Sequence, residues 1–466
     1  MAQVSFILAG ASMQPYRARN PRQSPLWQCA SRHFDDFVDH YPKEHESEYG
    51  PMRKIIPEVV QKFLNCGVLE RGFARIKCDE CQHEYLLAFS CKSRWFCPSC
   101  HQKKVQTSAE FILSQVLAGV PHRHYVLALP KMLRPYFQHH RGLLKGLCNI
   151  ARQCLTDYFR TALDLPDGVP GLVMTIHTFG EYLDFHPHLH ALVADGLFVR
   201  EGEFHVLPPM PLKPLEELFQ ARVLTWLEGL KLLPPARART LRSWIHTGFN
   251  LHAGERVEFE AKGDLENLAQ YILRNPFSVE KMTVESPGDT IIYRSKLNAK
   301  IHRNFEVFSA TDFLARITNH IPDKGCQRVR YYGWYSNKMR GQRERQAAAL
   351  PNLQPAVSSL QPASAPGRQV IRIPPPSAKR LPSKKWRDLI LKVWHADPMS
   401  CPVCHRPMRM LAVVDQPDVI EKILRHLGLW CGLPPPTGTG PPPKELTYVP
   451  FDDVDPMPDY ENVLCD

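Results

Sequence analysis

The sequence predicts an α+β protein in which an antiparallel or mixed sheet is flanked by helices. Strand-like and helix-like segments follow one another with hairpin-length connections, which does not fit a regular βαβ winding. Cysteine pairs with C-x-x-C spacing near both ends predict small metal-binding units beside that sheet. A chain of 466 residues, 44% of them hydrophobic, is long enough for two or three domains with a packed core.

The chain divides by composition into segments that we expect to behave differently. Residues 116–345 carry the strands and helices of the main domain, and residues 51–115 form a cysteine-rich, zinc-binding domain before it. Residues 346–380 are rich in proline, serine and alanine, which predicts an extended linker. The other segments are an irregular N-terminal arm over residues 1–50, a small C-x-x-C domain over 381–432 and a disordered tail over 433–466.

Hydrophobic periodicity predicts individual elements within these segments. Apolar residues at helical spacing predict a helix over residues 56–71 and, within the arm, a short amphipathic helix around residues 33–41. Apolar runs bounded by turn residues predict strands over residues 122–130, 171–178, 185–195 and 199–206. Helical spacing returns over residues 138–163, 212–232 and 264–274.

The formal charge of +11 favours a polyanionic partner, because clustered Lys and Arg neutralise phosphates and release counterions. No run approaches the roughly 18 apolar residues that would cross a bilayer, and the N-terminus lacks the basic residues of a secretory signal. We therefore expect a cytoplasmic protein with no membrane association. The 14 cysteines agree, because several lie in pairs suited to metal and a chain of this length needs no disulfides.

Two C-x-x-C pairs separated by 15 residues lie in the N-terminal domain: Cys78 with Cys81, and Cys97 with Cys100. Four thiolates supplied from two tight turns close a tetrahedral structural Zn²⁺ site, so we expect these cysteines to bind one zinc ion. Nearby residues that could replace a ligand are Cys91, His83 and His101. Basic and aromatic residues around the pairs fit a DNA-contacting surface, and a solvated basic face would have the same pattern.

A third pair, Cys401 and Cys404, stands alone in the small C-terminal segment. It offers half of a second zinc site. The candidates for the other ligands are His395, His405, His426 and Cys431, and the sequence does not choose among them. A pair of half-buried thiols is the alternative.

Three histidines occupy alternate positions at the start of an apolar strand: His186, His188 and His190. Alternate side chains of a strand share one face, and neutral imidazole is the commonest transition-metal ligand. A single histidine in such a place is usually a solvated residue of a polar edge strand. Two or three on one face, running into an apolar sequence, indicate a metal site.

Tyr271 lies in the helix expected over residues 264–274, which Pro276 ends. A tyrosine in a helix is usually a core or interface aromatic residue. Arg274 follows at i+3, where it could reach the same phosphate as Tyr271. Only the combination of Tyr271 with the strand that carries His186, His188 and His190 suggests that the tyrosine is catalytic.

The pair His188 and His190, with a helical tyrosine about eighty residues later, resembles the HUH (His-hydrophobic-His) endonucleases. Further segments make the chain similar to the insertion sequence 91 family of rolling-circle transposases: residues 78–100, 122–131, 180–196, 313–322 and 329–338. The resemblance covers most of residues 55–430. Some members of that family carry a second tyrosine four residues before the first, and this chain has Asn267 there, so it resembles a single-tyrosine variant.

The resemblance implies a DNA transposase that nicks and rejoins single-stranded DNA at the ends of an element. His188 and His190 would hold a catalytic divalent ion, Mg²⁺ or Mn²⁺, although imidazoles by themselves favour softer metals. A third ligand would come from His177, which we favour, or from His186 or Asn275.

The same resemblance implies the roles of the helix residues. Tyr271 would attack the phosphate to give a 5′-phosphotyrosine and a free 3′-OH, and Arg274 would contact the phosphate. Successive cleavages would then need the freed 3′-OH, a second subunit in a homodimer or another tyrosine. The other tyrosines that could serve are Tyr331, Tyr332 and Tyr335, although their arginine-rich, aromatic surroundings are more typical of a surface that stacks on DNA bases or contacts phosphates. Such a protein would act on DNA inside a bacterial cell.

The sequence does not exclude three other functions. In a non-catalytic zinc-finger DNA-binding protein, the histidines and Tyr271 would be structural. A zinc hydrolase built on the alternating histidines would need a nearby carboxylate, for which Asp184 and Asp195 are only loosely placed. A replication initiator or relaxase would share the tyrosine chemistry, and the N-terminal cysteine unit and the overall resemblance argue for transposition instead.

Overall fold

The computed structural model of the protein describes residues 20–93, 95–199, 202–244, 247–285, 290–298, 302–349, 369–373, 387, 390–391 and 396–431. Helices and antiparallel strands make up this part of the chain, so the expected α+β fold is confirmed. None of its helices is long and apolar enough to cross a membrane. The tail expected over residues 433–466 and most of the expected linker lie outside the described residues.

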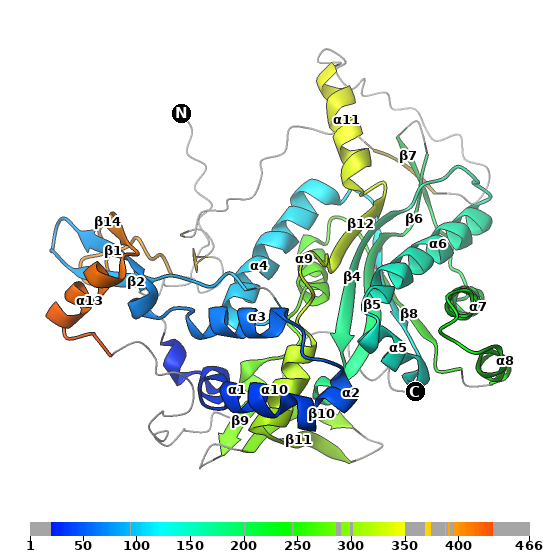
Figure 1. The fold of residues 1–466 in the computed structure, drawn as a ribbon. Coiled ribbons are helices and arrows are strands. Elements are labelled where there is room, and N and C mark those ends of the chain that lie inside the picture. The colour runs from blue at the N-terminus through cyan, green and yellow to red at the C-terminus, as the bar shows by residue number, and fades with distance from the viewer. Residues whose placement is uncertain are drawn as a thin grey trace.

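A five-stranded antiparallel sheet lies at the centre of the protein (Figure 1). Its strand order is β12, β4, β5, β3, β8, with bounds Val329–Gly333, Gly171–Phe179, Phe185–Ala194, His122–Ala128 and Asn250–Val257. Three of these strands confirm the expected strands over residues 122–130, 171–178 and 185–195. β4 and β5 are buried along almost their whole length, because other elements cover both faces of the sheet.

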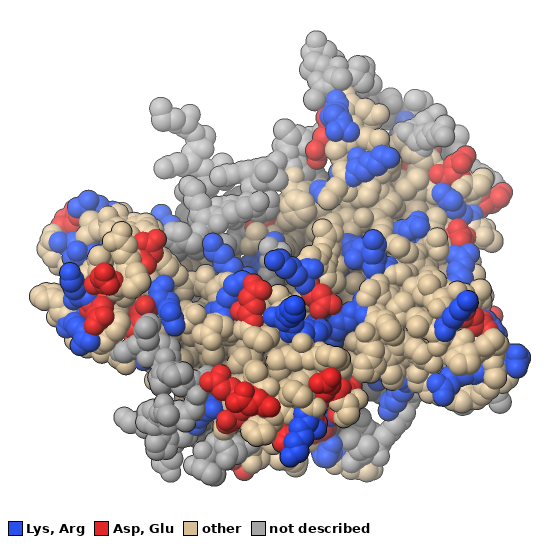
Figure 2. All heavy atoms as spheres, viewed as in Figure 1, with Lys and Arg blue, Asp and Glu red and all other residues tan. Residues whose placement is uncertain are grey.

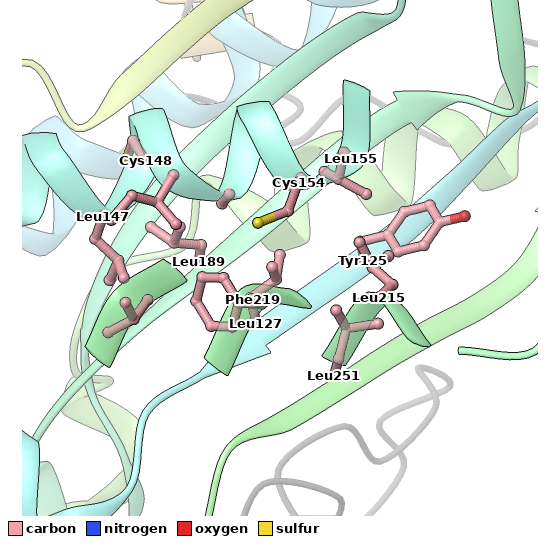
Figure 3. Close-up of a cluster of buried hydrophobic side chains, with 14 of the residues drawn as sticks. Tyr125, Leu127, Leu147, Cys148, Cys154, Leu155, Leu189, Leu215, Phe219 and Leu251 are labelled. Carbon is pink, nitrogen blue, oxygen red and sulfur yellow. The ribbon is translucent and has the colours of Figure 1, made fainter. Parts of the chain in front are cut away.

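One face of the sheet packs against a helical layer through apolar side chains (Figure 3). Leu127 and Leu189 of the sheet share a buried cluster with Leu147 of α6 and Phe219 of α7. The helices of this layer are α5 (Arg134–His139), α6 (Leu143–Leu163), α7 (Lys213–Gly229) and α8 (Pro235–Ser243). The helix expected over residues 138–163 is thus two helices. α6 ends at Leu163, because the next residue, Asp164, has a left-handed backbone (φ 50°) that stops the helix.

The opposite face of the sheet carries histidines beside apolar residues. There Val173 and Leu192 of the sheet pack with Leu265 and Ile272 of α9. The covering elements are α4 (Pro98–Phe111), its continuation as a π-helical turn (Ile112–Val116) and α9 (Lys262–Ile272). Because α9 lies across β5, the histidines of β5 are inside an interface and not on a solvated edge.

The N-terminal segment is helical from residue 25 onward, so the expectation of an irregular arm over residues 1–50 is wrong for that part. Its helices are α1 (Pro25–Glu44) and α2 (Glu46–Tyr49), followed by α3 (Ile55–Leu64). α1 buries Leu26, Phe34 and Phe37 against α3 and α10. Proline at the first position of a helix supports helix formation, and Pro42 lies in the last turn, so neither residue breaks α1.

A small antiparallel sheet and one helix enclose this N-terminal core from the other side. The strands are β9 (Met282–Glu285), β10 (Thr290–Asn298) and β11 (Arg303–Ser309), and β10 lies between the other two. α10 (Ala310–Asn319) follows directly. Ser309 caps α10 by accepting a hydrogen bond from the backbone N–H of Asp312, which explains why the strand changes to a helix at this residue.

The C-terminal cysteine segment is part of the N-terminal zinc-binding unit. β14 (Met408–Val414) pairs with β1 (Phe73–Cys78), which pairs on its other edge with β2 (Glu84–Ala88). Helix α13 (Pro417–His426) packs on this sheet, and Figure 1 shows the whole unit at one side of the molecule. The expectation of a separate domain over residues 381–432 is therefore wrong, because two of the three strands of its sheet come from residues 73–88.

Short strands and helices complete the described structure. β6 (Gly196–Phe198) and β7 (Glu203–Val206) form a hairpin where one strand was expected over residues 199–206. β13 (Val370–Arg372), from the expected linker, pairs with β7, and α11 (Asn337–Ala349) extends beyond β12. Single 3₁₀ turns lie at Pro21–Gln23, Leu69–Arg71, Lys131–Leu133, Glu181–Leu183 and Val279–Lys281.

Candidate metal and nucleophile site

Three histidines of β4 and β5 meet on the face of the sheet beneath α9. His177 lies directly opposite His188 in the antiparallel pairing, and His190 is two residues further along β5. One ring nitrogen from each of the three lies within 4.8 Å of the others. The strand register therefore brings together the two histidines expected as metal ligands and the favoured third candidate.

Hydrogen bonds fix which ring nitrogens of His177 and His188 carry a proton. The His177 Nε2 lies 2.9 Å from the carbonyl oxygen of Ile272, and the His188 Nδ1 lies 2.8 Å from that of His186. A carbonyl oxygen only accepts, so these nitrogens must donate. The other nitrogen of each neutral ring then keeps its lone pair, which is the form that binds a metal ion.

His190 is the third member of this group. Its Nδ1 lies 2.9 Å from Nε2 of His124, and its Nε2 lies 3.0 Å from Nε2 of His188. If His190 donates to His124, its Nε2 is also a free ligand. Two nitrogens about 2.1 Å from one ion at a right angle would lie about 3.0 Å apart, so the observed spacing fits adjacent ligands of an octahedral ion.

Burial keeps His177 and His190 neutral. It lowers the pKa of His177 and of His190 well below the usual range, and the neighbouring His188 lowers both further. Burial also lowers the pKa of His124 to about 3. Neutral imidazoles bind metal without first losing a proton, so the donor set fits a divalent ion.

His186 lies outside the three-histidine group. Its ring centre is 5.1 Å from that of His188, and its buried Nε2 has no hydrogen-bond partner among the described residues. The side-chain nitrogen of Asn275, another candidate ligand, donates to the carbonyl oxygen of Phe277, and its Oδ1 is buried without a hydrogen-bond partner among the described residues. His177, whose ring nitrogen lies within 4.8 Å of those of His188 and His190, is favoured over His186 as the third ligand.

Tyr271 lies against the histidines from the side of α9. Its ring centre is 5.5 Å from that of His190, with the ring planes nearly perpendicular. Two histidines hold the end of α9 in place by bonding its carbonyl groups: His177 binds that of Ile272, and His101 binds that of Leu273 at 2.8 Å. The same helix end that carries Tyr271 is therefore anchored to β4 and to α4.

Arg274 connects Tyr271 with a neighbouring cavity. Its guanidinium lies over the ring of Tyr271 at 4.5 Å and over that of Phe179 at 5.3 Å. Arg274, Phe179 and the N-terminal residues of α4 line a cavity of about 420 Å³ that continues along residues 274–281. The guanidinium that packs on Tyr271 therefore also borders this cavity.

Neither carboxylate that a zinc hydrolase would require lies at the histidine group. Asp195 is fully buried and forms ion pairs with Arg123 and Arg256. Asp184 is paired with Arg316. Because both acids are engaged with arginines, neither of them is available as the general base that the hydrolase hypothesis requires.

The first cluster of cysteines joins the second N-terminal pair to two single residues. Cys97 and Cys100, at the start of α4, lie with Cys66 and Cys91. The sulfur atom of Cys66 is 3.7 Å from that of Cys97 and 3.6 Å from that of Cys100. Four thiolates at about 2.3 Å from a tetrahedral zinc ion would lie about 3.8 Å apart, so this cluster has the dimensions of a zinc site.

The second cluster joins cysteines from opposite ends of the chain. Cys78 and Cys81 lie with Cys401 and Cys404. The sulfur atom of Cys78 is 3.5 Å from that of Cys404, and that of Cys81 is 3.4 Å from that of Cys401. The pairing of β1 with β14 places the two turns side by side.

The expectation of one zinc site from the two N-terminal pairs is therefore wrong. β2 follows Cys81 and carries the chain away from it, so that Cys97 and Cys100 reach a different part of the fold. None of the residues expected to complete the Cys401 site does so among the described residues; His395 lies outside them. Cys66 was missed because a single cysteine far from any motif has no local signal.

Comparison with known proteins matches both parts of the chain. Residues 171–343 match a family of putative transposases, and residues 31–129 match a transposase zinc-binding domain. The first range contains the histidines and Tyr271, and the second contains six cysteines of the two clusters. The second range also begins before residue 51, in agreement with the packing of α1 on α3.

Two relatives are similar over most of their length. The transposase for insertion sequence element IS801 of Pseudomonas savastanoi pv. phaseolicola is 28% identical over 337 residues, which is 69% of this chain and 79% of that protein. The putative transposase y4qJ of Sinorhizobium fredii (strain NBRC 101917 / NGR234) is 24% identical over 394 residues, 80% of this chain and 92% of that protein. No solved structure is significantly similar to the chain.

The structural zinc-type clusters, the fold and these similarities agree with one another. Two thiolate clusters lie within or adjoin the segment that matches a transposase zinc-binding domain, and the antiparallel sheet lies within the segment that matches transposases. The chain belongs to the insertion sequence 91 family of transposases.

Proposed function

We propose that this transposase cleaves and rejoins single-stranded DNA at the ends of its element through a covalent 5′-phosphotyrosine at Tyr271. The observation that carries the proposal is the contact between Tyr271 and His190, a member of the three-histidine group. A nucleophile and a metal site act on one phosphate only if they are adjacent. Among the described tyrosines, Tyr271 is the one whose ring packs on these histidines.

His177, His188 and His190 would hold the divalent ion, Mg²⁺ or Mn²⁺. Such an ion, when bound, offsets negative charge that develops on the oxygens of the scissile phosphate. The protein positions Tyr271 through the anchored end of α9, and Arg274 holds a phosphate oxygen beside it. In the reaction, the Tyr271 oxygen forms a bond to phosphorus, and the bond from phosphorus to the 3′ oxygen breaks.

The other tyrosines are poorly placed for the same role. Tyr335 is fully buried, and its hydroxyl lies 2.8 Å from Nε2 of His122. Tyr332 belongs to the opposite face of the sheet, whereas Tyr331 packs near Phe111 and Arg340. A second cleavage would therefore use either the freed 3′-OH or, in a homodimer, Tyr271 of the second subunit.

The test is covalent capture of DNA. We expect the protein, incubated with Mn²⁺ and single-stranded oligonucleotides from the ends of its element, to form an adduct that survives a denaturing gel. Tyr271→Phe should form none, because the phenyl ring keeps the packing on His190 and lacks the hydroxyl. Tyr331→Phe is the matched control and should form the adduct at the normal rate.

Two outcomes would reject the proposal. An adduct that persists in Tyr271→Phe would assign the nucleophile elsewhere. Absence of any adduct with every strand of the element, while the protein still binds these strands, would favour a DNA-binding protein without cleavage activity.

A further inference from the structure

A second cavity, of about 450 Å³, lies on the other side of the central sheet from the histidines. It is bordered by the start of α6, by β4 and β12 at one edge of the sheet, and by the loop over residues 322–327. Ile176 lines it, whereas the next residue, His177, belongs to the histidine group. Neighbouring residues of a strand point to opposite faces, so this cavity is separate from the one beside Tyr271.

The lining of this cavity is strongly basic. It contains five cationic side chains: Arg141, Lys145, Lys324, Arg328 and Arg330. The one carboxylate in the lining is Asp323, and Arg53 lies 2.7 Å from it in an ion pair. The charge of that acid is thus already offset by a cation from outside the lining.

Arg328 is the most buried cation of this cavity. Only 4% of its surface is exposed, and one terminal nitrogen donates to the hydroxyl of Thr178 and to the carbonyl oxygen of His320. The other terminal nitrogen, Nη1, is buried and has no hydrogen-bond partner among the described residues. A buried guanidinium with an unused donor costs free energy unless an anion or another acceptor reaches it.

The remaining cations differ in burial. Arg141 is half-buried and donates to the side-chain oxygen of Asn319, while Lys145 and Lys324 are exposed at the rim. Burial lowers the pKa of Arg141 to about 9 and that of Arg328 to about 10, so the folded protein confines these charges at a cost that a bound anion would relieve. The N-terminus of α6, with Gly142 as its cap, adds a favourable dipole.

We propose that this cavity binds a phosphate group of single-stranded DNA, at a position on the strand away from the phosphate that Tyr271 attacks. Guanidinium groups match the geometry of phosphate oxygens, and the rim lysines would neutralise the adjacent phosphates. The site would hold the strand at the edge of the sheet formed by β4 and β12. Figure 2 shows basic side chains across the middle of the viewed face, with acidic side chains gathered below them over α1 and α10. This proposal rests on the proposed DNA-cleaving function.

The test uses the exposed lysines, because replacing Arg328 would also remove its bonds to Thr178 and His320. Affinity for a labelled single-stranded oligonucleotide is measured at several salt concentrations in the Tyr271→Phe background, where no cleavage occurs. We expect Lys145→Gln combined with Lys324→Gln to weaken binding about tenfold. The slope of log affinity against log salt should fall by about 0.7 for each phosphate that the variant no longer neutralises. Lys231→Gln combined with Arg239→Gln, two exposed cations outside the cavity, should change neither.

Free phosphate is the second arm of the experiment. The thermal midpoint of unfolding is measured in inorganic phosphate and in chloride at equal ionic strength. Phosphate could raise the midpoint of the protein but not that of the double lysine variant, while both proteins bind the oligonucleotide equally. In that case the cavity binds a small phosphate compound, and the DNA assignment is wrong. If the protein and the double lysine variant have the same oligonucleotide affinity and the same thermal midpoint in phosphate, the cavity is not an anion site. Because binding is measured without cleavage, these results do not depend on whether Tyr271 forms an adduct.

Discussion

The histidine group and the cysteine clusters are assembled in different ways. His177, His188 and His190 come from two neighbouring strands and lie at most 13 residues apart in the sequence. In one cysteine cluster, by contrast, Cys78 and Cys404 are 326 residues apart. The histidines lie beneath a helix that carries a candidate nucleophile, whereas the cysteines of this cluster lie where turns from distant segments meet.

This difference indicates two roles. A four-thiolate cluster has no position open to substrate, and the cluster of Cys78, Cys81, Cys401 and Cys404 ties together segments whose small sheet buries few residues. The three-histidine group leaves positions for other ligands, and a tyrosine and an arginine lie beside it. We therefore expect changes at the cysteines to affect folding first, and changes at the histidines to affect catalysis first.

The largest expected effect is at His190. His190→Ala removes one ligand and the packing against Tyr271, so adduct formation should fall by about 10³-fold, the scale of several kcal/mol that a metal ion supplies. Adduct rate measures catalysis and elemental analysis measures zinc, which should remain at its normal content. His205→Gln, on β7, should leave both unchanged. A loss of zinc in His190→Ala, or a rate within tenfold of normal, would remove the functional contrast between the two regions.

The next effect concerns the cysteine clusters. Cys401→Ser and Cys97→Ser should each reduce the zinc content by one ion per chain, because these residues belong to different clusters. Each should lower the free energy of unfolding by on the order of 3 kcal/mol, since metal binding is coupled to folding. The exposed Cys431 provides the control, Cys431→Ser. If either variant lost both ions together, the clusters would not be independent.

The smallest effect is a pH dependence from the buried histidines. Burial lowers the pKa of His122 to about 4 in the folded protein, below its value of about 6.5 in an unfolded chain. As pH falls below about 6.5, the unfolded state takes up a proton that the folded state does not, so stability is complete above that pH and declines toward pH 4. The decline is about 1.4 kcal/mol per pH unit for one such histidine.

Urea denaturation between pH 7.5 and 5.5, with zinc content monitored, measures this slope. His122→Gln should reduce the loss of stability between pH 6.5 and 5.5 by about 1 kcal/mol, because the unfolded histidine is only partly protonated in this range. An unchanged slope would show that His122 does not contribute to the loss of stability in acid.

Local patterns in the sequence predicted much of the central domain. Alternation placed His186, His188 and His190 on one face of a strand, and helical spacing placed Tyr271 near the end of a helix. The C-x-x-C spacing identified three pairs of zinc-type ligands. It could not predict which pairs combine, because that depends on the pairing of β1 with β14.

The sequence by itself determined the elements and the faces on which their side chains lie, since both follow from short-range periodicity. The tertiary structure decided which faces meet. Strand register placed His177 opposite His188 and left His186 outside the group, and the packing of α9 on β5 placed Tyr271 against His190. Pairing between distant segments depends on the total burial and hydrogen bonding of the fold, which no local pattern records.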